Sequence, residues 1–379
     1  MKGLVLIDFQ GHTRYLVVAN RTVKVELGNR SYSILVGDGL LASIGRRCRS
    51  LRLGKRCVVI TDSVVGPLYG EEVMSSLVKA GFEPALVSIP SGEASKRLKV
   101  VESCFDQLAA HRLERSSFIV ALGGGVVGDL AGFVAATYLR GIDFVQVPTT
   151  LLAQVDSSVG GKTGVNLAAG KNLVGAFYQP KLVLCDLATL ASLPEREYRS
   201  GLAEVIKYGI IYDAPLFKKL ERDIGKLLLL DSKVLGPVIS RCCRIKADVV
   251  ALDEKEGGLR AILNFGHTIG HAIEATAGYG KYLHGEAIAI GQVLAARLSE
   301  PLSGLNPKDS QRIKTLLEHA GLPVDMNVTP KKGERLHAAM ALDKKVAQGQ
   351  VKFVLAQSIG CVKHGVPVDR ETIDQICFS

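Results

Sequence analysis

Short apolar strand patterns alternate with helical patterns through the first half of the chain, and this alternation limits the possible folds more than any other feature. Strands are expected near 23–27, 56–61, 84–89, 117–122, 144–148 and 182–185, and helices near 69–80 and 98–111. This alternation predicts a parallel sheet covered by helices. Beyond about residue 188 the strand patterns fade, and helices are expected over 199–225, 232–252, 261–275, 284–298 and 308–320.

A chain of 379 residues exceeds the size at which a single core stops growing. We therefore expect two domains. Residues 1–187 would form an α/β domain with a parallel sheet, and residues 188–379 a mostly α-helical domain. The cleft between them is the natural place for a binding site.

Composition excludes several classes of protein. No apolar run is long enough to span a membrane, and the early Asp8 argues against a signal peptide, so we expect a cytoplasmic protein. The net charge of +10 comes from dispersed Lys and Arg without interleaved aromatics, so an anionic small substrate or simple solubility explains it as well as nucleic-acid binding would. The eight cysteines form no C-x-x-C pair, so we expect reduced and mostly buried thiols.

Three of the eight histidines lie close together in the sequence, at His267, His271 and His284. His267 and His271 are four residues apart, so a helix would present both imidazoles on one face. A single histidine of this kind is more often a hydrogen-bonded core residue. Three together, each beside a glycine, favour a metal site or an acid–base site.

A glycine-rich loop follows the strand expected at 117–122 and precedes an apolar helical stretch. Its residues Gly123, Gly125 and Gly128 match the pattern G-x-G-x-x-G. Such a loop lets the backbone approach a pyrophosphate at a helix N-terminus. The acidic residue usually found about twenty positions later is poorly matched, because Asp143 is only 15 residues beyond Gly128. The loop thus favours a Rossmann-like nucleotide-binding domain, but not an ordinary Rossmann dehydrogenase.

A second loop, residues 156–163, ends in Gly-Gly-Lys-Thr but is not an ATP-binding P-loop, because Asp156 stands where the first glycine is required. The turn can still offer backbone N–H groups and the Lys162 ammonium to an anion. Lys171 and Asn172 follow among small residues. This setting favours anion binding over an ordinary solvated surface.

Glu204 and Lys207 are three residues apart and share one face of an expected helix. An exposed pair of this kind would contribute less than about 1 kcal/mol to stability. The flanking residues are all apolar, namely Leu202, Ala203, Val205 and Ile206. That setting is typical of a carboxylate that faces the core.

Together these segments resemble the 3-dehydroquinate synthase family of sugar-phosphate cyclases. The resemblance runs in order over almost the whole chain. It rests on Pro90-Ser-Gly-Glu-Ala-Ser-Lys96, 123–129, Arg140-Gly141, Pro148-Thr-Thr150, 154–164, Gly170-Lys-Asn172, Leu193-Pro-Glu-Arg-Glu197, 201–209, 260–267, His284-Gly-Glu286 and Asp343-Lys-Lys345. Residues 1 to about 20 lie upstream of where the family's first strand usually begins.

The resemblance implies conversion of 3-deoxy-D-arabino-heptulosonate 7-phosphate to 3-dehydroquinate and phosphate. NAD would oxidise a substrate hydroxyl, phosphate would leave, the ketone would be reduced again, and ring opening and an aldol step would close the carbocycle. A divalent metal, Zn2+ or Co2+, would be held by Glu204, His267 and His284 and would polarise the hydroxyl. A homodimer is implied as well.

The resemblance also assigns roles to individual residues. The implied catalytic residues are His271, Lys162, Lys207, Arg260, Asn264 and Glu204. The implied substrate contacts are Arg140, Asp156, Lys162, Asn172, Lys207, Lys246, Arg260, Asn264, His271, Lys344 and Lys345, with Arg140 offered across a dimer interface. The implied cofactor contacts are Asp62, Glu93, Lys96, Gly124, Gly125, Val126, Asp129, Thr149, Thr150, Asp156, Lys162, Lys171 and Glu197.

Three other functions remain as alternatives. Related cyclases that make valiolone or inosose precursors share the scaffold, although Arg260, Asn264 and the Asp-Lys-Lys345 motif suit the dehydroquinate reaction better. A metal-dependent polyol or alcohol dehydrogenase would not need the lysine-rich anion pocket. A nucleic-acid binder would show a salt-dependent affinity for DNA.

Overall fold

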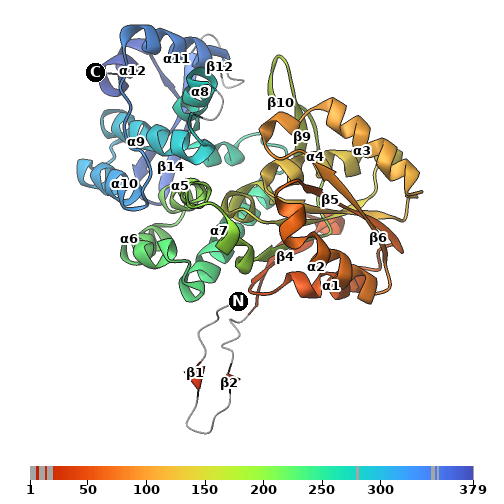
Figure 1. Ribbon diagram of the computed structural model, residues 1–379. Coiled ribbons are helices and arrows are strands. Elements are labelled where there is room, and N and C mark those ends of the chain that lie inside the picture. Colours follow the sequence, from red (N-terminus) through yellow and green to blue (C-terminus); the bar gives the residue numbers. More distant parts are fainter. Residues whose placement is uncertain are drawn as a thin grey trace.

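The computed structural model describes residues 6–7, 13–14, 20–278, 281–342, 346–347 and 350–378. Lys344 and Lys345 lie outside the described residues. The α/β half of the chain lies on the right in Figure 1 and the helix-rich half on the left. Among the described residues, no helix is both long and apolar enough to cross a bilayer. All eight cysteines are free thiols, and only Cys361 is exposed, as expected.

A seven-stranded sheet forms the centre of the α/β half, in the order β3-β4-β11-β8-β7-β5-β6. The strands are β3 (Arg21–Val25), β4 (Tyr32–Gly37), β5 (Arg56–Asp62), β6 (Glu83–Ile89), β7 (Phe118–Gly123), β8 (Asp143–Pro148) and β11 (Leu182–Asp186). Only the β3–β4 pair is antiparallel, and the other pairs are parallel. The predicted parallel sheet is confirmed, although β4 was not foreseen.

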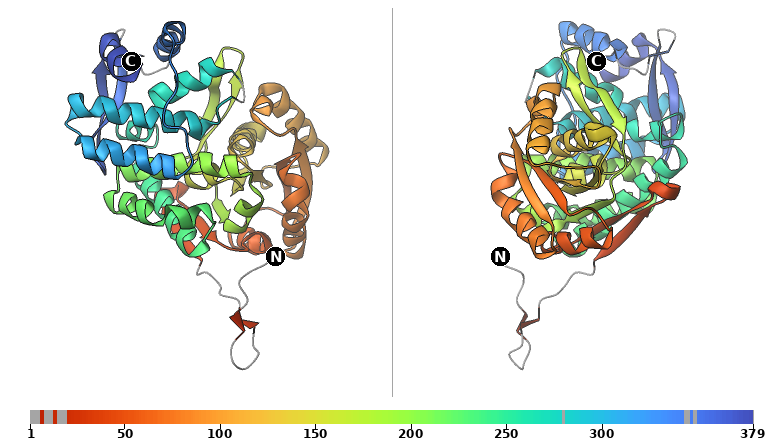
Figure 2. Two further views of the ribbon diagram at one scale, coloured as in Figure 1. Left: turned by 60° about the vertical axis from the view of Figure 1, so that its left-hand side comes forward. Right: turned by 90° about the vertical axis from the view of Figure 1, so that its right-hand side faces the viewer.

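Helices cover both faces of this sheet, which explains why inner strands such as β5, β7 and β11 are nearly continuous apolar runs rather than alternating ones. Along β5, Val59 faces a core shared with α1 (Ile44–Ser50) and α2 (Val65–Lys79). Its neighbour Val58 faces the opposite core, shared with α3 (Leu98–Ala110) and α4 (Gly125–Thr137). The two layers of helices can be followed in Figures 1 and 2.

The second half is built mainly from helices. They are α5 (Glu195–Ile211), α6 (Ala214–Leu228), α7 (Ser232–Leu252), α8 (His267–Ala277), α9 (His284–Ser303), α10 (Pro307–His319), α11 (Pro330–Leu342) and α12 (Arg370–Cys377). The single helix expected over 199–225 is two helices, α5 and α6. Asp213 begins α6 by accepting a hydrogen bond from the Leu216 N–H at 2.9 Å, and a proline occupies the first turn.

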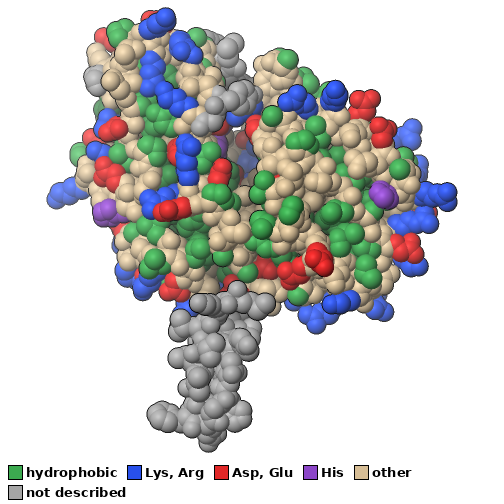
Figure 3. Space-filling model, viewed as in Figure 1, with side chains coloured by type: hydrophobic (Ala, Val, Ile, Leu, Met, Phe, Trp, Pro, Cys, Tyr) green, Lys and Arg blue, Asp and Glu red, His purple; other side chains and the backbone are tan. Residues whose placement is uncertain are grey.

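Outside the main sheet, three antiparallel elements of the described residues were absent from the sequence prediction, and the smallest pairs β1 (Leu6–Ile7) with β2 (Thr13–Arg14). A three-stranded sheet of β12 (Val346–Ala347), β13 (Gln350–Ser358) and β14 (Cys361–Val368) packs in a core with α8, α9 and α11. A hairpin of β9 (Lys162–Leu167) and β10 (Gly170–Phe177) rises from the α/β half beside the helix-rich half (Figure 1). The surface is hollowed next to this hairpin (Figure 3).

Candidate active site

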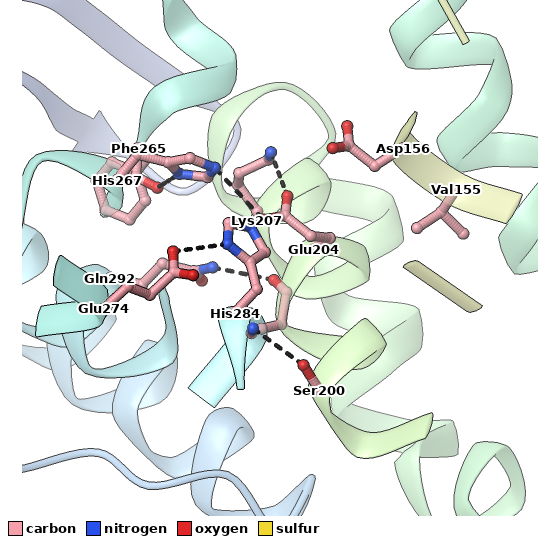
Figure 4. Close-up of polar contacts among 12 residues, drawn as sticks. Val155, Asp156, Ser200, Glu204, Lys207, Phe265, His267, Glu274, His284 and Gln292 are labelled. Carbon is pink, nitrogen blue, oxygen red and sulfur yellow. Dashed lines mark hydrogen bonds and ion pairs between the residues drawn. The ribbon is translucent and has the colours of Figure 1, made fainter. Parts of the chain in front are cut away.

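Three helices each contribute one side chain to a compact cluster of potential metal ligands. Glu204 lies within α5, while His267 and His284 are the first residues of α8 and α9. Glu204 Oε1 lies 3.4 Å from His267 Nε2 and 3.3 Å from His284 Nε2 (Figure 4). The three ligand atoms all lie within 4.8 Å of one another. Glu204 is completely buried, as its apolar neighbours predicted.

Close helix packing brings these residues together. A Cβ at Gly285 would lie 1.8 Å from the Ser200 carbonyl oxygen, so only glycine lets the start of α9 approach α5 this closely. The Gly285 N–H donates to Ser200 Oγ at 2.9 Å. Gly266, with φ +79°, starts α8 in the left-handed conformation and lies against Gln292 of α9. His267 and His284 are thereby aimed at Glu204.

The hydrogen bonds of the two imidazoles favour metal binding. His267 Nδ1 lies 3.1 Å from the Phe265 carbonyl oxygen, and His284 Nδ1 lies 2.9 Å from Glu274 Oε2. These acceptors place a proton on each Nδ1 and leave Nε2 as the ligand atom. In a tetrahedral zinc site, two nitrogen or oxygen ligand atoms are roughly 3.3 Å apart. The residues present therefore fit a divalent metal.

Electrostatics show that the cluster attracts positive charge, whether a proton or a metal ion. Burial raises the pKa of Glu204, but Lys207 and His284 more than offset this and lower it below its usual range. Burial lowers the pKa of His284, while Glu204 and Glu274 raise it to about 10. The cluster thus holds an ionised carboxylate that attracts cations. A second possible ligand group, His271 with Glu274 and His284, shares His284 with the first.

Buried charges surround the cluster. Lys207, only 1% exposed, forms an ion pair with Glu204. Asp156 Oδ1 accepts from Lys246 Nζ at 2.6 Å and from the Tyr208 hydroxyl at 3.0 Å. Burial raises the pKa of Asp156, but the two lysines lower it well below its usual range. The structure thus brings together Asp156, Lys207 and Lys246, as expected, and adds Tyr208, which the sequence did not indicate.

The predicted site residues Lys162, Arg260 and Asn264 lie near the carboxylate of Glu256, which the sequence did not indicate. Lys162 Nζ lies 2.7 Å from Glu256 Oε2. Burial raises the pKa of Glu256, but Lys162, Arg260 and Asn264 together lower it. Arg260 is 1% exposed and donates from Nη2 to the Gly160 carbonyl oxygen at 3.2 Å. Glu256 was overlooked because the charged run at 253–256 is typical of an ordinary exposed loop.

The residues expected to bind a nucleotide gather at the carboxyl ends of the parallel strands, where ligands bind in open α/β sheets. We call these ends the nucleotide edge. Its residues are Asp62, Gly124, Gly125, Val126, Thr149 and Thr150. Lys96, 5% exposed, lies 2.6 Å from Asp129 Oδ2 and 2.5 Å from Asn172 Oδ1. Glu93 Oε1 accepts from the Asn166 amide at 2.7 Å. Asp62 Oδ1 also accepts from the Val64 and Val65 N–H groups at the start of α2.

Some expected site residues lie apart from their assigned groups. Asn172, expected among the substrate contacts, is held by Lys96 at the nucleotide edge. Lys171, expected near the cofactor, forms an ion pair with Glu274 of α8 at 3.3 Å. Arg140 is exposed, and Glu197 is exposed near the start of α5. By contrast, the ring centroids of His267, His271 and His284 lie 5.2, 5.6 and 6.1 Å apart in pairs, so the three predicted histidines do meet.

Comparison with known proteins identifies the family. A model of the 3-dehydroquinate synthase N-terminal region matches residues 86–200, and one of the C-terminal region matches residues 201–346. A 3-dehydroquinate synthase from Geobacter metallireducens is 54% identical over 339 residues, which cover 89% of this chain and 94% of the relative. The chain belongs to the 3-dehydroquinate synthase family. Another member, from Desulforamulus reducens, is 51% identical over 90% of this chain and 95% of its own length.

Solved structures agree with this family and with the predicted fold class. A 2-epi-5-epi-valiolone synthase from Streptomyces hygroscopicus subsp. jinggangensis 5008, solved with NAD+ and Zn2+, has a TM-score of 0.83 at 29% identity and covers 93% of this chain and 96% of its own. A 2-deoxy-scyllo-inosose synthase, solved with carbaglucose-6-phosphate, NAD+ and Co2+, has a TM-score of 0.81 at 27% identity, over 94% and 99% of the two chains. A probable glycerol dehydrogenase from Sinorhizobium meliloti 1021, 17% identical with a TM-score of 0.62 over 90% of this chain and 94% of its own, shares the fold.

Proposed function

We propose that this chain converts 3-deoxy-D-arabino-heptulosonate 7-phosphate to 3-dehydroquinate and phosphate, as a lyase that uses NAD and a divalent metal, Zn2+ or Co2+. The observation that carries the proposal is the Glu204–His267–His284 cluster, built around a fully buried carboxylate with buried cations beside it, in a chain that aligns with 94% of a 3-dehydroquinate synthase. We further propose that residues 1–187 form the nucleotide domain and residues 188–379 the metal and substrate domain.

In this proposal the bound metal and NAD supply Lewis acidity toward a substrate hydroxyl and a reversible hydride acceptor. Glu204, His267 and His284 hold the metal. Burial lowers the pKa of Lys207, but Glu204 and Asp156 raise it more, so Lys207 remains an ammonium donor beside the metal. At Lys246 the effect of burial exceeds the opposing effect of Asp156, so the pKa of Lys246 is lowered and its ammonium group releases a proton more readily.

The remaining side chains bind and orient the substrate and the cofactor. Lys162, Arg260, Asn264 and His271 would receive the anionic groups of the sugar phosphate through short charge-assisted contacts. We assign the cofactor to the carboxyl ends of the strands, with Lys171 and Glu197 at the margin. Lys344 and Lys345 are retained as substrate contacts on the resemblance of their motif.

Phosphate release tests the reaction directly. Purified protein is incubated with the heptulosonate phosphate, NAD and Zn2+, and inorganic phosphate and NADH absorbance are recorded. We expect phosphate release that requires NAD, with no net NADH, because the oxidation is reversed within each turnover. NADH accumulating in step with product would identify a dehydrogenase instead. Glucose 6-phosphate is the control substrate, and turnover of it alone would indicate a cyclase of the inosose type.

We also propose a cytoplasmic homodimer that engages neither membrane nor nucleic acid, in which Arg140 reaches the partner's site. Leu139 and Arg140 have φ of 51° and 69° at the end of α4. Arg140 is exposed, and its side chain has no hydrogen bond or ion pair with the described residues of its own chain. Mixing inactive Arg140→Ala and Lys162→Ala subunits tests this arrangement. A hybrid dimer would contain one intact site and regain activity, whereas a verified but inactive hybrid would rule it out.

A further inference from the structure

The carboxylate of Glu274, in α8, contacts both halves of the molecule. Its Oε2 lies 2.9 Å from Nδ1 of His284, on the side of the ring away from Glu204 (Figure 4). Its Oε1 lies 3.3 Å from Nζ of Lys171, in the β9–β10 hairpin. One acidic side chain therefore contacts both a proposed metal ligand and the α/β half.

Burial and charge show that this carboxylate is a defined part of the site. Its side chain is 15% exposed. Both of its oxygens have a partner, because Oε1 faces the Lys171 ammonium and Oε2 faces the His284 ring. The side chain accepts a hydrogen bond from His284 Nδ1–H.

The two histidine ligands differ in how they are held. His267 Nδ1 is bound by the backbone carbonyl of Phe265, an acceptor that no substitution removes, and its side chain is 10% exposed. His284 is 29% exposed and depends on the Glu274 side chain for the same contact. Loss of Glu274 would free the ring to rotate or to move its proton to Nε2, the atom that faces Glu204.

We propose that Glu274 is a positioning residue that fixes His284 for metal binding, and that Lys171 couples it to the hairpin. This inference rests on the proposed metal site. The neighbour of Lys171, Asn172, is held at 2.5 Å by Lys96, which in turn lies 2.6 Å from Asp129 at the nucleotide edge. Adjacent hairpin residues thus contact the nucleotide edge and the metal cluster, so the position of the hairpin and the affinity for metal should depend on each other.

Metal affinity tests the role of Glu274. The dissociation constants for Zn2+ and Co2+ are measured by competition with a chromophoric chelator for wild type, Glu274→Gln and Glu274→Ala. We expect Glu274→Gln to bind metal about 10- to 100-fold more weakly, because its amide keeps a hydrogen-bond acceptor but loses the charge, and Glu274→Ala to bind more weakly still. The visible absorption of bound Co2+ should change in both variants, since it reports ligand geometry.

The control is Glu221→Gln, which removes a carboxylate paired with Arg312 on α6 and α10 at 2.7 Å, outside the metal cluster. It should bind metal as wild type does. Affinity and Co2+ spectrum of Glu274→Gln equal to those of the control would overturn the proposal, even if the metal-free variant were less stable to heat. Failure of wild type to bind one metal per chain would instead overturn the proposed function.

The role of Lys171 has its own measurement. Lys171→Met should weaken metal binding only a few-fold, because the Lys171–Glu274 pair is half exposed on the lysine side. Hydrogen exchange of the hairpin amides should slow when wild type binds metal, and this slowing should be absent in Lys171→Met. Equal slowing in both proteins would show that Lys171 does not couple the hairpin to the metal.

Discussion

The nucleotide edge and the metal cluster are built in opposite ways. The nucleotide edge is formed where parallel strands end, so its glycines and threonines are placed by local chain geometry. The metal cluster takes one side chain from each of α5, α8 and α9 and exists only because those helices pack closely. The first region should therefore tolerate most damage to the second, apart from the small coupling that we propose through Lys171.

Removing a metal ligand should give the largest effect. His284→Ala should lose the metal and lower activity by more than about a hundredfold, a greater loss than an outer contact would cause. NAD affinity should stay close to that of wild type, because the strand ends do not depend on His284. Elemental analysis measures the metal, and isothermal titration calorimetry measures NAD binding. A variant with a full complement of metal would contradict the ligand assignment.

The next effect separates packing from ligation. Gly285→Ala keeps every ligand but places a Cβ 1.8 Å from the Ser200 carbonyl oxygen. The helices α5 and α9 must separate, so we expect the free energy of unfolding to fall by about 1–3 kcal/mol and metal affinity to drop with it. Chemical denaturation and metal titration measure the two quantities.

Gly225→Ala in α6 is the matched control, because a Cβ there meets nothing within 4 Å. It should stabilise the protein by roughly 0.5–1 kcal/mol, since alanine is the better helix former. Equal behaviour of the two alanine variants would show that close approach of α9 to α5 is not what assembles the cluster.

The same contrast explains what the sequence could predict. Strands β5, β7 and β8 are short apolar runs that end at Asp62, Gly123 and Pro148, so their type and order followed from local pattern. The pair His267 and His271 was visible from helical spacing. Glu204 could be linked to them only through the family resemblance, because no local pattern fixes how α5 packs against α8 and α9.

Other features depend on contacts between distant segments. Strand β4 pairs with β11 nearly 150 residues later, at Leu35 and Leu184. Glu256 and Glu274 acquire their roles from Lys162 and His284, which lie in other elements. Glu274 did carry a local signal, since it follows His271 by three residues and so shares a helix face with it.

At the nucleotide edge we expect a smaller and more selective effect. In Gly125→Ala the new Cβ would lie 3.1 Å from Ser157 Oγ, so the neighbour must shift slightly, and the methyl group would stand at the N-terminus of α4. NAD affinity should fall about tenfold, because backbone N–H groups there can no longer approach a pyrophosphate closely. Metal affinity should not change.

Gly70→Ala in α2 controls for the added methyl group, since its nearest neighbour would be 3.8 Å away. Its NAD affinity should match that of wild type. If Gly125→Ala bound metal more weakly but bound NAD as wild type does, the proposed separation of the two regions would be wrong.

The smallest predicted effect concerns Glu256, whose carboxylate lies 2.7 Å from the Lys162 ammonium. This pairing neutralises one of the cations that we propose to bind the substrate phosphate. The side chains of Lys162 and Glu256 are 50% and 34% exposed, so solvent screens the pair and its contribution is at most about 1 kcal/mol. Because a substrate phosphate must displace this carboxylate, Glu256→Gln should bind inorganic phosphate and substrate a few-fold more tightly.

Glu83→Gln makes the same charge change in an exposed pair with Lys55, in the α/β half, and corrects for net charge. Phosphate inhibition constants are compared for the two variants over a range of salt concentrations. If Glu256→Gln binds phosphate no better than Glu83→Gln, then Glu256 does not compete for the pocket, and Lys162 is held for some other contact.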